Sequence, residues 1–276
     1  MINTIFREGL FGGKVVLITG GGTGIGLRAA REFGKLGAKI VIASRKQEKL
    51  NGGLEVLKED GIEAIAVECN IRNEESIQNC VKECMDQFGT IDILVNNGGG
   101  QFPSPAEVIN RKGWHAVVET NLTGTFFLTQ QVFNEAFSKN GGAVVNILMN
   151  HRNGFPMMAH SAAARSGVEN LTKTLSTEWG RYGVRINSIM PGIIDSAGLK
   201  SYAPQFQEMV YAYGKNNQTN RLGTEAELVA AIVFLASPGA SFITGITMAV
   251  DGGESLYTPL YPPVENEKNP AHRDEK

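Results

Sequence analysis

Residues 19–26 read Thr-Gly-Gly-Gly-Thr-Gly-Ile-Gly, and this stretch decides the fold. It follows an apolar run at 14–19 and opens a segment of helical periodicity at 24–36. Glycines in such a turn allow a tight bend, close approach of the backbone to a pyrophosphate and close packing of the helix. The free N–H groups at the start of the helix attract the phosphates. The stretch therefore predicts a dinucleotide-binding loop made of Gly20, Gly22, Thr23, Gly24, Ile25 and Gly26.

Around this loop, runs rich in Val, Ile and Leu alternate with helical segments. Strands are predicted at 14–19, 38–43, 63–68, 91–95, 143–149, 184–190 and 246–250, and helices at 24–36, 74–88, 116–138 and 160–181. Continuous apolar strands are typical of sheets covered on both faces. Regular alternation of strand and helix implies right-handed crossovers. The pattern predicts one doubly wound Rossmann-type α/β domain whose seven-stranded parallel sheet is flanked by helices.

Two segments depart from the alternation. Residues 198–222 follow the sixth strand, and their apolar side chains recur at helical spacing, at Phe206, Met209, Val210 and Tyr213. Because open α/β sheets bind ligands beyond the carboxyl ends of their strands, we expect this segment to be a substrate lid. Residues 259–276 are rich in Pro, Asn and charge, which predicts a C-terminal tail behind a domain over 1–258.

Composition excludes several classes of protein. A net charge of −2 with 20 % charged residues does not suit a binder of nucleic acid or anionic membranes. No apolar run reaches the roughly 18–20 residues of a membrane helix, and residues 1–13 lack the apolar core of a secretory signal. Cys69, Cys80 and Cys84 have no metal-site spacing, so we expect free buried thiols, no metal and a cytoplasmic location.

The second predicted strand ends in Ala43-Ser44-Arg45-Lys46. An NAD-selective site carries a carboxylate there, which binds the ribose 2′-hydroxyl. Here a hydroxyl and two cations, Ser44, Arg45 and Lys46, would attract the 2′-phosphate of NADP instead. The planar Arg45 guanidinium can also stack on the adenine. The sequence predicts NADP(H) as the cofactor.

Taken together, the motifs resemble the short-chain dehydrogenase/reductase family over almost the whole chain. The shared motifs are the glycine loop at 19–26, Asn96-Asn97-Gly98-Gly99, Asn121, Pro191-Gly192 and the closing Asp-Gly-Gly at 251–253. The resemblance implies that Asn70 and Ile71 flank the adenine and that Asn97 and Gly98 line the ribose. It also implies that Pro191, Gly192 and the backbone of Ile194 face the nicotinamide.

The chain departs from the family at the active site, where a Tyr-x-x-x-Lys pair and a preceding Ser are usual. Alignment places Ser161 at the tyrosine and Arg165 at the lysine, and the usual Ser position falls near Leu148 or Met149. Of the usual four residues only Asn121 remains. Arg165 retains a permanent cation that can grip ribose hydroxyls. Ser161 is too weak an acid to replace a tyrosine, so His151 and His160 are the nearby candidates for the proton donor.

A Ser-x-x-x-basic pair resembles the acyl-CoA branch of the family, the 2,4-dienoyl-CoA and peroxisomal trans-2-enoyl-CoA reductases. The stretches 70–75, 96–102 and 113–117 look especially like the trans-2-enoyl-CoA reductases. The resemblance implies NADPH-dependent reduction of an enoyl thioester, with Asn121, Ser161, Arg165 and His151 at the catalytic centre. Charge then develops as an enolate on the thioester oxygen, which hydrogen-bond donors stabilise without acting as acids. Lys200, Lys215 and Arg221 are candidates for the CoA phosphates.

Two other functions remain open at this point. One is a carbonyl reductase or alcohol dehydrogenase with a substitute proton donor, for which a tyrosine of 198–222 is the candidate. The other is a catalytically silent NADP(H)-binding protein, which would bind cofactor without turnover. The helices at 116–138 and 160–181 carry more apolar surface than one sheet covers, and this predicts a homodimer or homotetramer.

Overall fold

The computed structural model describes residues 4–256 and 268–274, and it is built around a seven-stranded parallel sheet. The strand order is β3-β2-β1-β4-β5-β6-β9. The strands are β1 (Val15–Thr19), β2 (Lys39–Ser44), β3 (Ala64–Glu68), β4 (Ile93–Asn96), β5 (Gly142–Ile147), β6 (Val184–Pro191) and β9 (Thr247–Val250). All six pairings are parallel, so the predicted sheet and fold class are confirmed.

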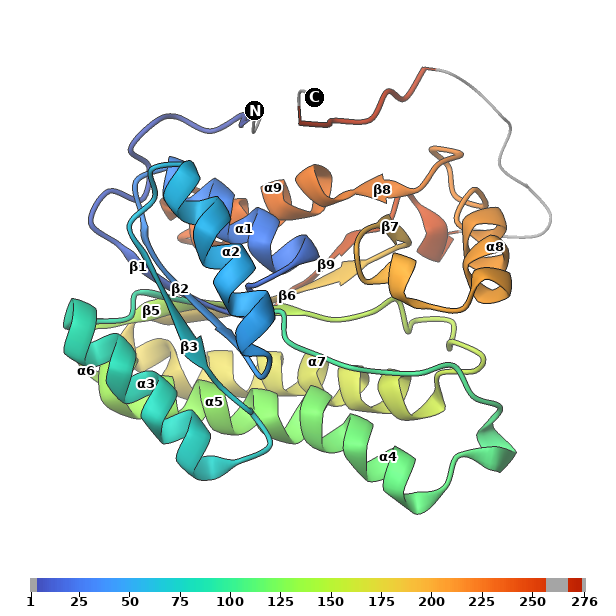
Figure 1. Ribbon diagram of the computed structural model, residues 1–276, viewed down its shortest axis with the longest axis horizontal. Coiled ribbons are helices and arrows are strands. Elements are labelled where there is room, and N and C mark those ends of the chain that lie inside the picture. The colour runs from blue at the N-terminus through green and yellow to red at the C-terminus, as the bar shows by residue number, and fades with distance from the viewer. Residues whose placement is uncertain (1–3, 257–267, 275–276) are drawn as a thin grey trace.

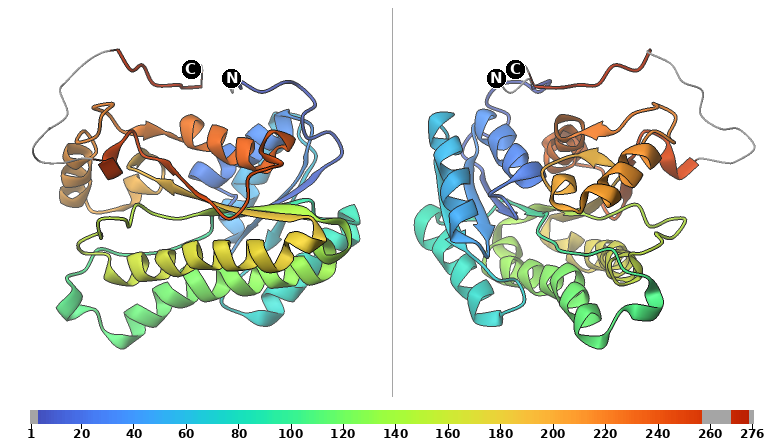
Figure 2. Two further views of the ribbon diagram at one scale, coloured as in Figure 1. Left: turned by 180° about the vertical axis from the view of Figure 1, so that it is seen from behind. Right: turned by 45° about the vertical axis from the view of Figure 1, so that its right-hand side comes forward.

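Helices cover both faces of the sheet (Figures 1 and 2). One layer holds α1 (Gly24–Lys35), α2 (Gln47–Glu59) and α9 (Glu225–Ala236). The other holds α3 (Glu74–Phe88), α4 (Arg111–Val118), α5 (Gly124–Val132), α6 (Ser138–Asn140) and α7 (Ala159–Trp179). The short α8 (Pro204–Tyr213) lies at one end of the molecule, near the small β7 (Ile194–Asp195) and β8 (Gly223–Thr224) pair. None of the helices in the described part of the chain is long and apolar enough to cross a membrane.

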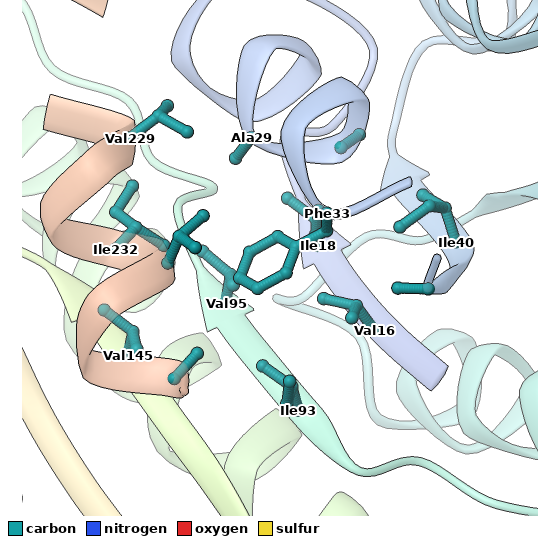
Figure 3. Close-up of a cluster of buried hydrophobic side chains, with 14 of the residues drawn as sticks. Val16, Ile18, Ala29, Phe33, Ile40, Ile93, Val95, Val145, Val229 and Ile232 are labelled. Carbon is teal, nitrogen blue, oxygen red and sulfur yellow. The ribbon is translucent and has the colours of Figure 1, made fainter. Parts of the chain in front are cut away.

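Strand β1 shows why the strands read as continuous apolar runs. Val16 and Ile18 pack with α1 and α9 on one face, as Figure 3 shows. Val15 and Leu17 pack into the cluster on the other face, with α3, α5 and α7. All four are at most 1 % exposed. Successive side chains of a strand point to opposite faces, so a strand covered on both sides is apolar at every position.

The helix predicted at 116–138 is part of a longer helical segment over 111–140 that contains two π-helical turns. The first π turn spans Glu119–Thr123 and carries Asn121, whose side chain is fully buried. A π turn inserts an extra residue into a helix and is frequent at functional sites. It rotates the following positions relative to a regular α-helix, and here it lies where the long helix passes the carboxyl edge of the sheet.

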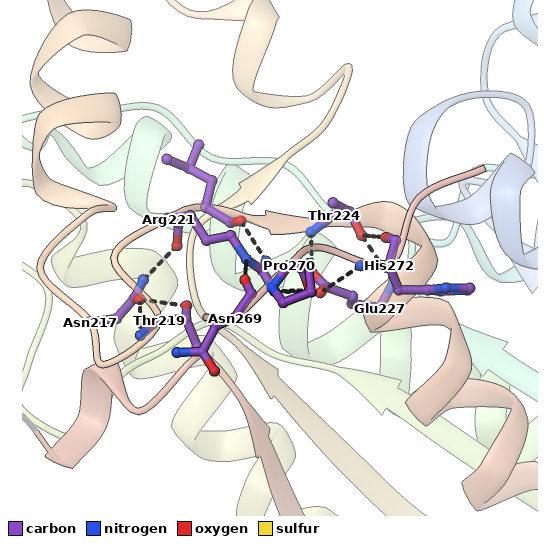
Figure 4. A network of polar contacts seen from close by, with 9 residues as sticks. Asn217, Thr219, Arg221, Thr224, Glu227, Asn269, Pro270 and His272 are labelled. Carbon is purple, nitrogen blue, oxygen red and sulfur yellow. Dashed lines mark hydrogen bonds and ion pairs between the residues drawn. The ribbon is translucent and has the colours of Figure 1, made fainter. Parts of the chain in front are cut away.

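The described end of the chain, 268–274, runs back over the N-terminal ends of α1 and α9. Asp274 forms a two-point ion pair with Arg28, at 2.7 Å to Nε and 2.9 Å to Nη2. Figure 4 shows the neighbouring contacts, in which Arg221 donates to the carbonyl of Asn269 and pairs with Glu227. This part of the predicted tail thus adds polar contacts rather than core, while 259–267 lies outside the described residues.

Candidate active site

The strand order reverses direction at β1, which has β2 on one side and β4 on the other. Loops diverge above such a switch point and leave a crevice at the carboxyl ends of the strands. A cavity of about 310 Å³ lies there, which we call the first cavity. Predicted cofactor residues that line it are Gly20, Gly22, Thr23, Gly24, Ile25, Ser44, Arg45, Lys46, Ile71, Asn97 and Gly98.

The glycine loop has the backbone that its sequence predicts. Gly20 has a φ of +66°, a conformation that side chains other than glycine rarely adopt. A Cβ atom at Gly26 would overlap the carbonyl oxygen of Gly20 and lie 2.7 Å from Nδ2 of Asn97. Gly26 is therefore needed for the close packing of α1 on the loop, although it does not line the cavity itself.

Polar contacts hold the loop after β4 against the glycine loop. The hydroxyl of Thr19 accepts a hydrogen bond of 2.7 Å from the backbone N–H of Gly98. The amide of Asn97 donates to the carbonyl of Thr19 at 3.0 Å. Because these bonds fix both loops in one arrangement, the carboxyl edge of the sheet is organised before a ligand arrives.

At the far end of the first cavity, Arg45, Lys46 and Lys49 contribute three cations. No acidic side chain is among its described lining residues. Of the two residues expected beside the adenine, Ile71 lines the cavity and Asn70 does not. The Asn70 side chain instead accepts a hydrogen bond from the backbone N–H of Arg72 at 3.2 Å. The described lining at this end of the cavity is therefore cationic.

A second cavity of about 420 Å³ adjoins the first, and both are lined by Ile25, Asn97, Gly99, Ser196 and Gly198. The expected nicotinamide-facing residues Pro191, Gly192 and Ile194 line this second cavity. Its remaining wall is largely apolar and includes Leu148, Met149, Phe155, Met158, Phe206 and Val210. A ligand that spans both cavities would therefore place its reacting end beside an apolar chamber.

Arg165 lies at the second cavity and is only 6 % exposed. Its Nη1 donates to the carbonyl of Ile147 at 2.8 Å, and its Nε has no hydrogen-bond partner among the described residues. Burial lowers the pKa of Arg165 to about 10, so the guanidinium stays charged at neutral pH. A Cβ at Gly99 would overlap this guanidinium, so the glycine leaves room for it. No salt bridge to Arg165 is found in the described part of the chain, and a buried unpaired cation suits an oxygen-rich ligand.

Asn121 and Ser161 come together, as expected, but behind the cavity wall. Asn121 exchanges two hydrogen bonds with the backbone of Gly100, at 2.9 and 3.1 Å, and its Nδ2 donates to Ser161 Oγ at 3.4 Å. Ser161 is fully buried, and its hydroxyl donates to Oε1 of Gln101 at 3.0 Å. Gln101 lines the second cavity, whereas Ser161 is not among its lining residues. Gln101 belongs to no catalytic motif, so the sequence does not predict it as a site residue.

The two histidines lie apart from the cavity. Nε2 of His151 is 3.1 Å from a carboxylate oxygen of Glu169, and His151 is not among the lining residues. Burial lowers the pKa of His160, whose Nδ1 accepts the backbone N–H of Ser161 at 2.8 Å. The His160 ring meets the edge of Phe102, with centroids 4.6 Å apart. A histidine held in these contacts does not face a substrate beside Pro191 and Gly192.

The predicted apolar face of the lid divides in the structure. Phe206 and Val210 of α8 line the second cavity, while Met209 and Tyr213 are 55 % and 49 % exposed. Phe206 and Val210, which are spaced i and i+4, therefore face the cavity. Met209 and Tyr213, which the spacing placed on the same apolar face, do not.

The cations of the lid segment are partly committed elsewhere. Lys200 pairs with Asp195 at 3.6 Å. Arg221 is held by Glu227 and by carbonyls of the tail, so the expectation that it meets CoA phosphates is not supported. Arg221 donates two hydrogen bonds to the carboxylate of Glu227. Glu227 also forms a capping box with Thr224 at the start of α9.

A buried carboxyl group behind the second cavity was not expected. Glu254 is 5 % exposed and accepts a hydrogen bond of 3.1 Å from Asn150, which lines the cavity. Its carboxylate also lies beside Gly192, where a Cβ would come within 2.9 Å of Oε2. Desolvation by burial raises the pKa of Glu254. The sequence could not identify it, because it follows the Asp-Gly-Gly motif as an ordinary loop residue.

The chain is similar to known reductases over most of its length. A family model described as Enoyl-(Acyl carrier protein) reductase matches residues 20–255. A Bacillus subtilis protein named as a probable 2,4-dienoyl-CoA reductase is 34 % identical over 246 residues, which is 88 % of this chain and 97 % of that protein. The peroxisomal 2,4-dienoyl-CoA reductase of Rattus norvegicus is 32 % identical over 258 residues, covering 92 % of this chain and 88 % of that protein.

Among solved structures, the citronellol catabolism dehydrogenase (AtuB) of Pseudomonas aeruginosa PAO1 superposes with a TM-score of 0.82. The two chains are 43 % identical, and the match covers 91 % of this chain and 99 % of the other. The fold is therefore shared with this structure over most of both chains.

Proposed function

The chain belongs to the short-chain dehydrogenase/reductase family, and from this premise we propose that it is an NADPH-dependent reductase of the 2,3 double bond of a trans-2-enoyl-CoA thioester. Family membership makes it an oxidoreductase with a nicotinamide cofactor. The observation that carries the finer proposal is the Ser161 and Arg165 pair on α7, in place of the usual tyrosine and lysine. The relatives are named as reductases of 2,4-dienoyl-CoA, which supports an unsaturated acyl-CoA thioester as the class of substrate.

In the proposed reaction, each group of site residues has a separate role. A bound nicotinamide supplies a hydride to the β-carbon of the thioester. Arg165, at the second cavity, would hold the cofactor ribose, and Pro191, Gly192 and Ile194 would lie beside the nicotinamide. Asn121 and Ser161 order the hydrogen-bond donors of the second cavity. Leu148, Phe206 and Val210 take up the acyl chain and exclude water.

A panel of thioesters tests the reaction. We expect NADPH absorbance to fall with trans-2-enoyl-CoA substrates and not with 3-ketoacyl-CoA substrates. The second candidate, a carbonyl reductase or alcohol dehydrogenase, is favoured by the name of the 43 % identical structure, and faster turnover of ketones or alcohols would establish it instead. Cofactor binding without turnover of any member of the panel would identify a silent NADP(H)-binding protein. A 2,4-dienoyl-CoA preference would place the chain with its curated relatives.

We propose NADPH rather than NADH because of the cations at Arg45, Lys46 and Lys49. Replacing Arg45 by aspartate is expected to lower affinity for NADPH roughly 10–100-fold, the worth of a charge-assisted hydrogen bond, and to favour NADH. Titration of cofactor fluorescence measures both affinities. Arg111→Asp on α4 makes the same change of charge at an exposed position outside the cavity, so it should change neither. Equal NADPH affinity in the Arg45 variant would contradict the assignment.

We also propose that the protein forms a homodimer or homotetramer. Trp114 on α4 and Phe127 on α5 are 39 % and 48 % exposed on the outer face of the helical layer. A closed two-fold interface would cover this apolar surface on both copies. Light scattering at micromolar concentration should therefore give at least a dimer, and Phe127→Asp should reduce the mass. A monomeric parent chain would refute the proposal.

The cytoplasmic location stays a prediction. The three cysteines are free and buried, which agrees with a reducing compartment. The rat relative is named as a peroxisomal enzyme, and localisation of the tagged chain in its own cells would decide between the two.

A further inference from the structure

Tyr202 lies between the turn Leu199–Ser201 and α8, and it lines the second cavity together with Arg165 and Gly192. It is the only tyrosine among the lining residues in the described ranges, 4–256 and 268–274. Its ring packs against Phe206, with centroids 5.1 Å apart. The lid segment therefore places a tyrosine hydroxyl at a site where α7 carries Ser161 in place of the usual tyrosine.

The phenol is the end of a directed chain of hydrogen bonds. Asn121 Nδ2 donates to Ser161 Oγ at 3.4 Å, and Ser161 donates to Gln101 Oε1 at 3.0 Å. The other end of the same amide, Gln101 Nε2, donates to the Tyr202 hydroxyl at 3.3 Å. Because the Tyr202 hydroxyl accepts a hydrogen bond from Gln101, the hydrogen of that hydroxyl is not used within this series of hydrogen bonds. The direction of every bond leaves that hydrogen available to a group in the cavity.

We propose that Tyr202 is the proton donor of the reaction, a role that rests on the proposed reduction of an enoyl thioester. As hydride adds to the β-carbon, the electron pair of the double bond moves toward the thioester oxygen. A new C–H bond then forms at the α-carbon with the Tyr202 proton, while the O–H bond of Tyr202 breaks. Gln101 Nε2 stabilises the phenolate that remains, as a hydrogen-bond donor to its oxygen. Water returns a proton to Tyr202, which is partly exposed.

The other candidates are less well placed for this step. The hydroxyl hydrogen of Ser161 is directed to Gln101, and Ser161 is fully buried. His151 faces Glu169 and is not among the residues that line the cavity. Ser161, Gln101 and Asn121 are therefore positioning residues for Tyr202 in this proposal.

Replacing Tyr202 by phenylalanine keeps the ring and its packing on Phe206 and removes only the donor. General acid catalysis contributes typically about 10²–10⁴-fold, so kcat should fall by at least about 10²-fold. The affinity for NADPH, measured by fluorescence without substrate, should stay within about twofold, since Tyr202 lines only the second cavity, while the phosphates and adenosine of the cofactor are expected in the first. Tyr211→Phe is the matched control, because Tyr211 belongs to the same lid segment, does not line the second cavity, and donates its hydroxyl to Asp195.

The configuration of the product gives a readout that is independent of rate. In deuterium oxide, a fixed donor delivers deuterium to one face of the α-carbon. Tyr202→Phe should give a mixture of configurations, because water then protonates either face, whereas Tyr211→Phe should retain one. A Tyr202→Phe protein that keeps both the parental kcat and a single configuration would overturn the proposal.

Gln101→Glu tests the direction of the chain with almost no change of shape. A carboxylate only accepts hydrogen bonds, so it would draw the Tyr202 hydrogen away from the cavity. We expect kcat to fall about as far as in Tyr202→Phe, with NADPH affinity unchanged. Parental kcat in Gln101→Glu would overturn the directed chain.

The failure of this inference is distinct from failure of the proposed function. If the parent chain reduces enoyl thioesters and the Tyr202 variant is unaffected, only the donor assignment is wrong. If the parent chain reduces ketones and no enoyl thioester, the proposed function is wrong. The same variants then ask whether Tyr202 protonates the alkoxide, and an unaffected variant refutes the assignment there as well. A parent chain that binds NADPH and turns over no substrate refutes both.

Discussion

Replacing Arg165 by alanine is expected to weaken NADPH binding and turnover together. The guanidinium is buried, stays charged at neutral pH and has no acidic partner in the described salt bridges. Its Nε is also without a partner there, and the residue lines the second cavity, so we expect the guanidinium charge to attract ligand oxygens in that cavity. Truncating one side of a buried, hydrogen-bonded charged contact costs about 2–5 kcal/mol, which corresponds to roughly 30- to 5,000-fold in kcat/KM.

Two measurements define this result. Fluorescence titration gives the Kd for NADPH, and steady-state kinetics give kcat/KM. Arg165→Lys is the informative comparison, because it keeps the charge and loses the planar fork, so we expect a partial recovery. Thermal unfolding should show little change of stability in the alanine variant, since it removes an unpaired buried charge together with one hydrogen bond to the carbonyl of Ile147. An unchanged NADPH affinity in Arg165→Ala would refute the ribose-holding role.

The second large effect is expected for Ser161→Ala, which should lower kcat with little change in KM. Loss of one donor from a preorganised site typically costs about 2.7–4 kcal/mol, or about 10²–10³-fold in rate. In the structure the hydroxyl bridges Asn121 and Gln101, so its removal breaks the order of the donors at the cavity wall. Ser166→Ala, at an exposed position of the same helix, is the matched control.

A double variant separates the two ways in which Ser161 can act. If Ser161 works through Gln101 and Tyr202, the kcat of the Ser161→Ala/Tyr202→Phe protein should be hardly lower than that of Tyr202→Phe alone. The Tyr202 substitution has then already interrupted the series of hydrogen bonds through which Ser161 acts. If Ser161 contacts the substrate directly, the two losses should multiply. A Ser161→Ala protein with the parental rate would leave Ser161 with a packing role only.

The sequence could predict the fold because its signals are local. Each strand run was identified with ends within two residues of those observed, since a strand buried on both faces needs apolar residues at every position. The glycine loop could likewise be predicted from the sequence, because the backbone geometry of this turn requires Gly20 and Gly26. The cations at Arg45 and Lys46 follow directly on a strand, so their place at the edge of the sheet was fixed once the strand was found.

The site could be predicted from the sequence only in part. Asn121, Ser161 and Arg165 were identified from the positions of family motifs, and the structure brings them to one end of the sheet. His151 was chosen because it is near in sequence, yet its side chain turns toward Glu169 on α7. Arg221 was selected as a lid cation, and the tail instead takes up its donors. Proximity along the chain does not give the direction in which a side chain points.

By itself, the sequence determined the Rossmann-type fold and the glycine loop at 19–26, and the family resemblance pointed to the Ser161 and Arg165 pair. Only the tertiary structure decided that Gln101 joins Ser161 to Tyr202, and that Glu254 lies behind Asn150. Gln101 is 60 residues from Ser161 and 101 from Tyr202. Such contacts between distant residues depend on where the crossover helices and the lid segment lie at the edge of the sheet. Periodicity records which face of an element is buried, and it carries no information about which distant side chain will meet it there.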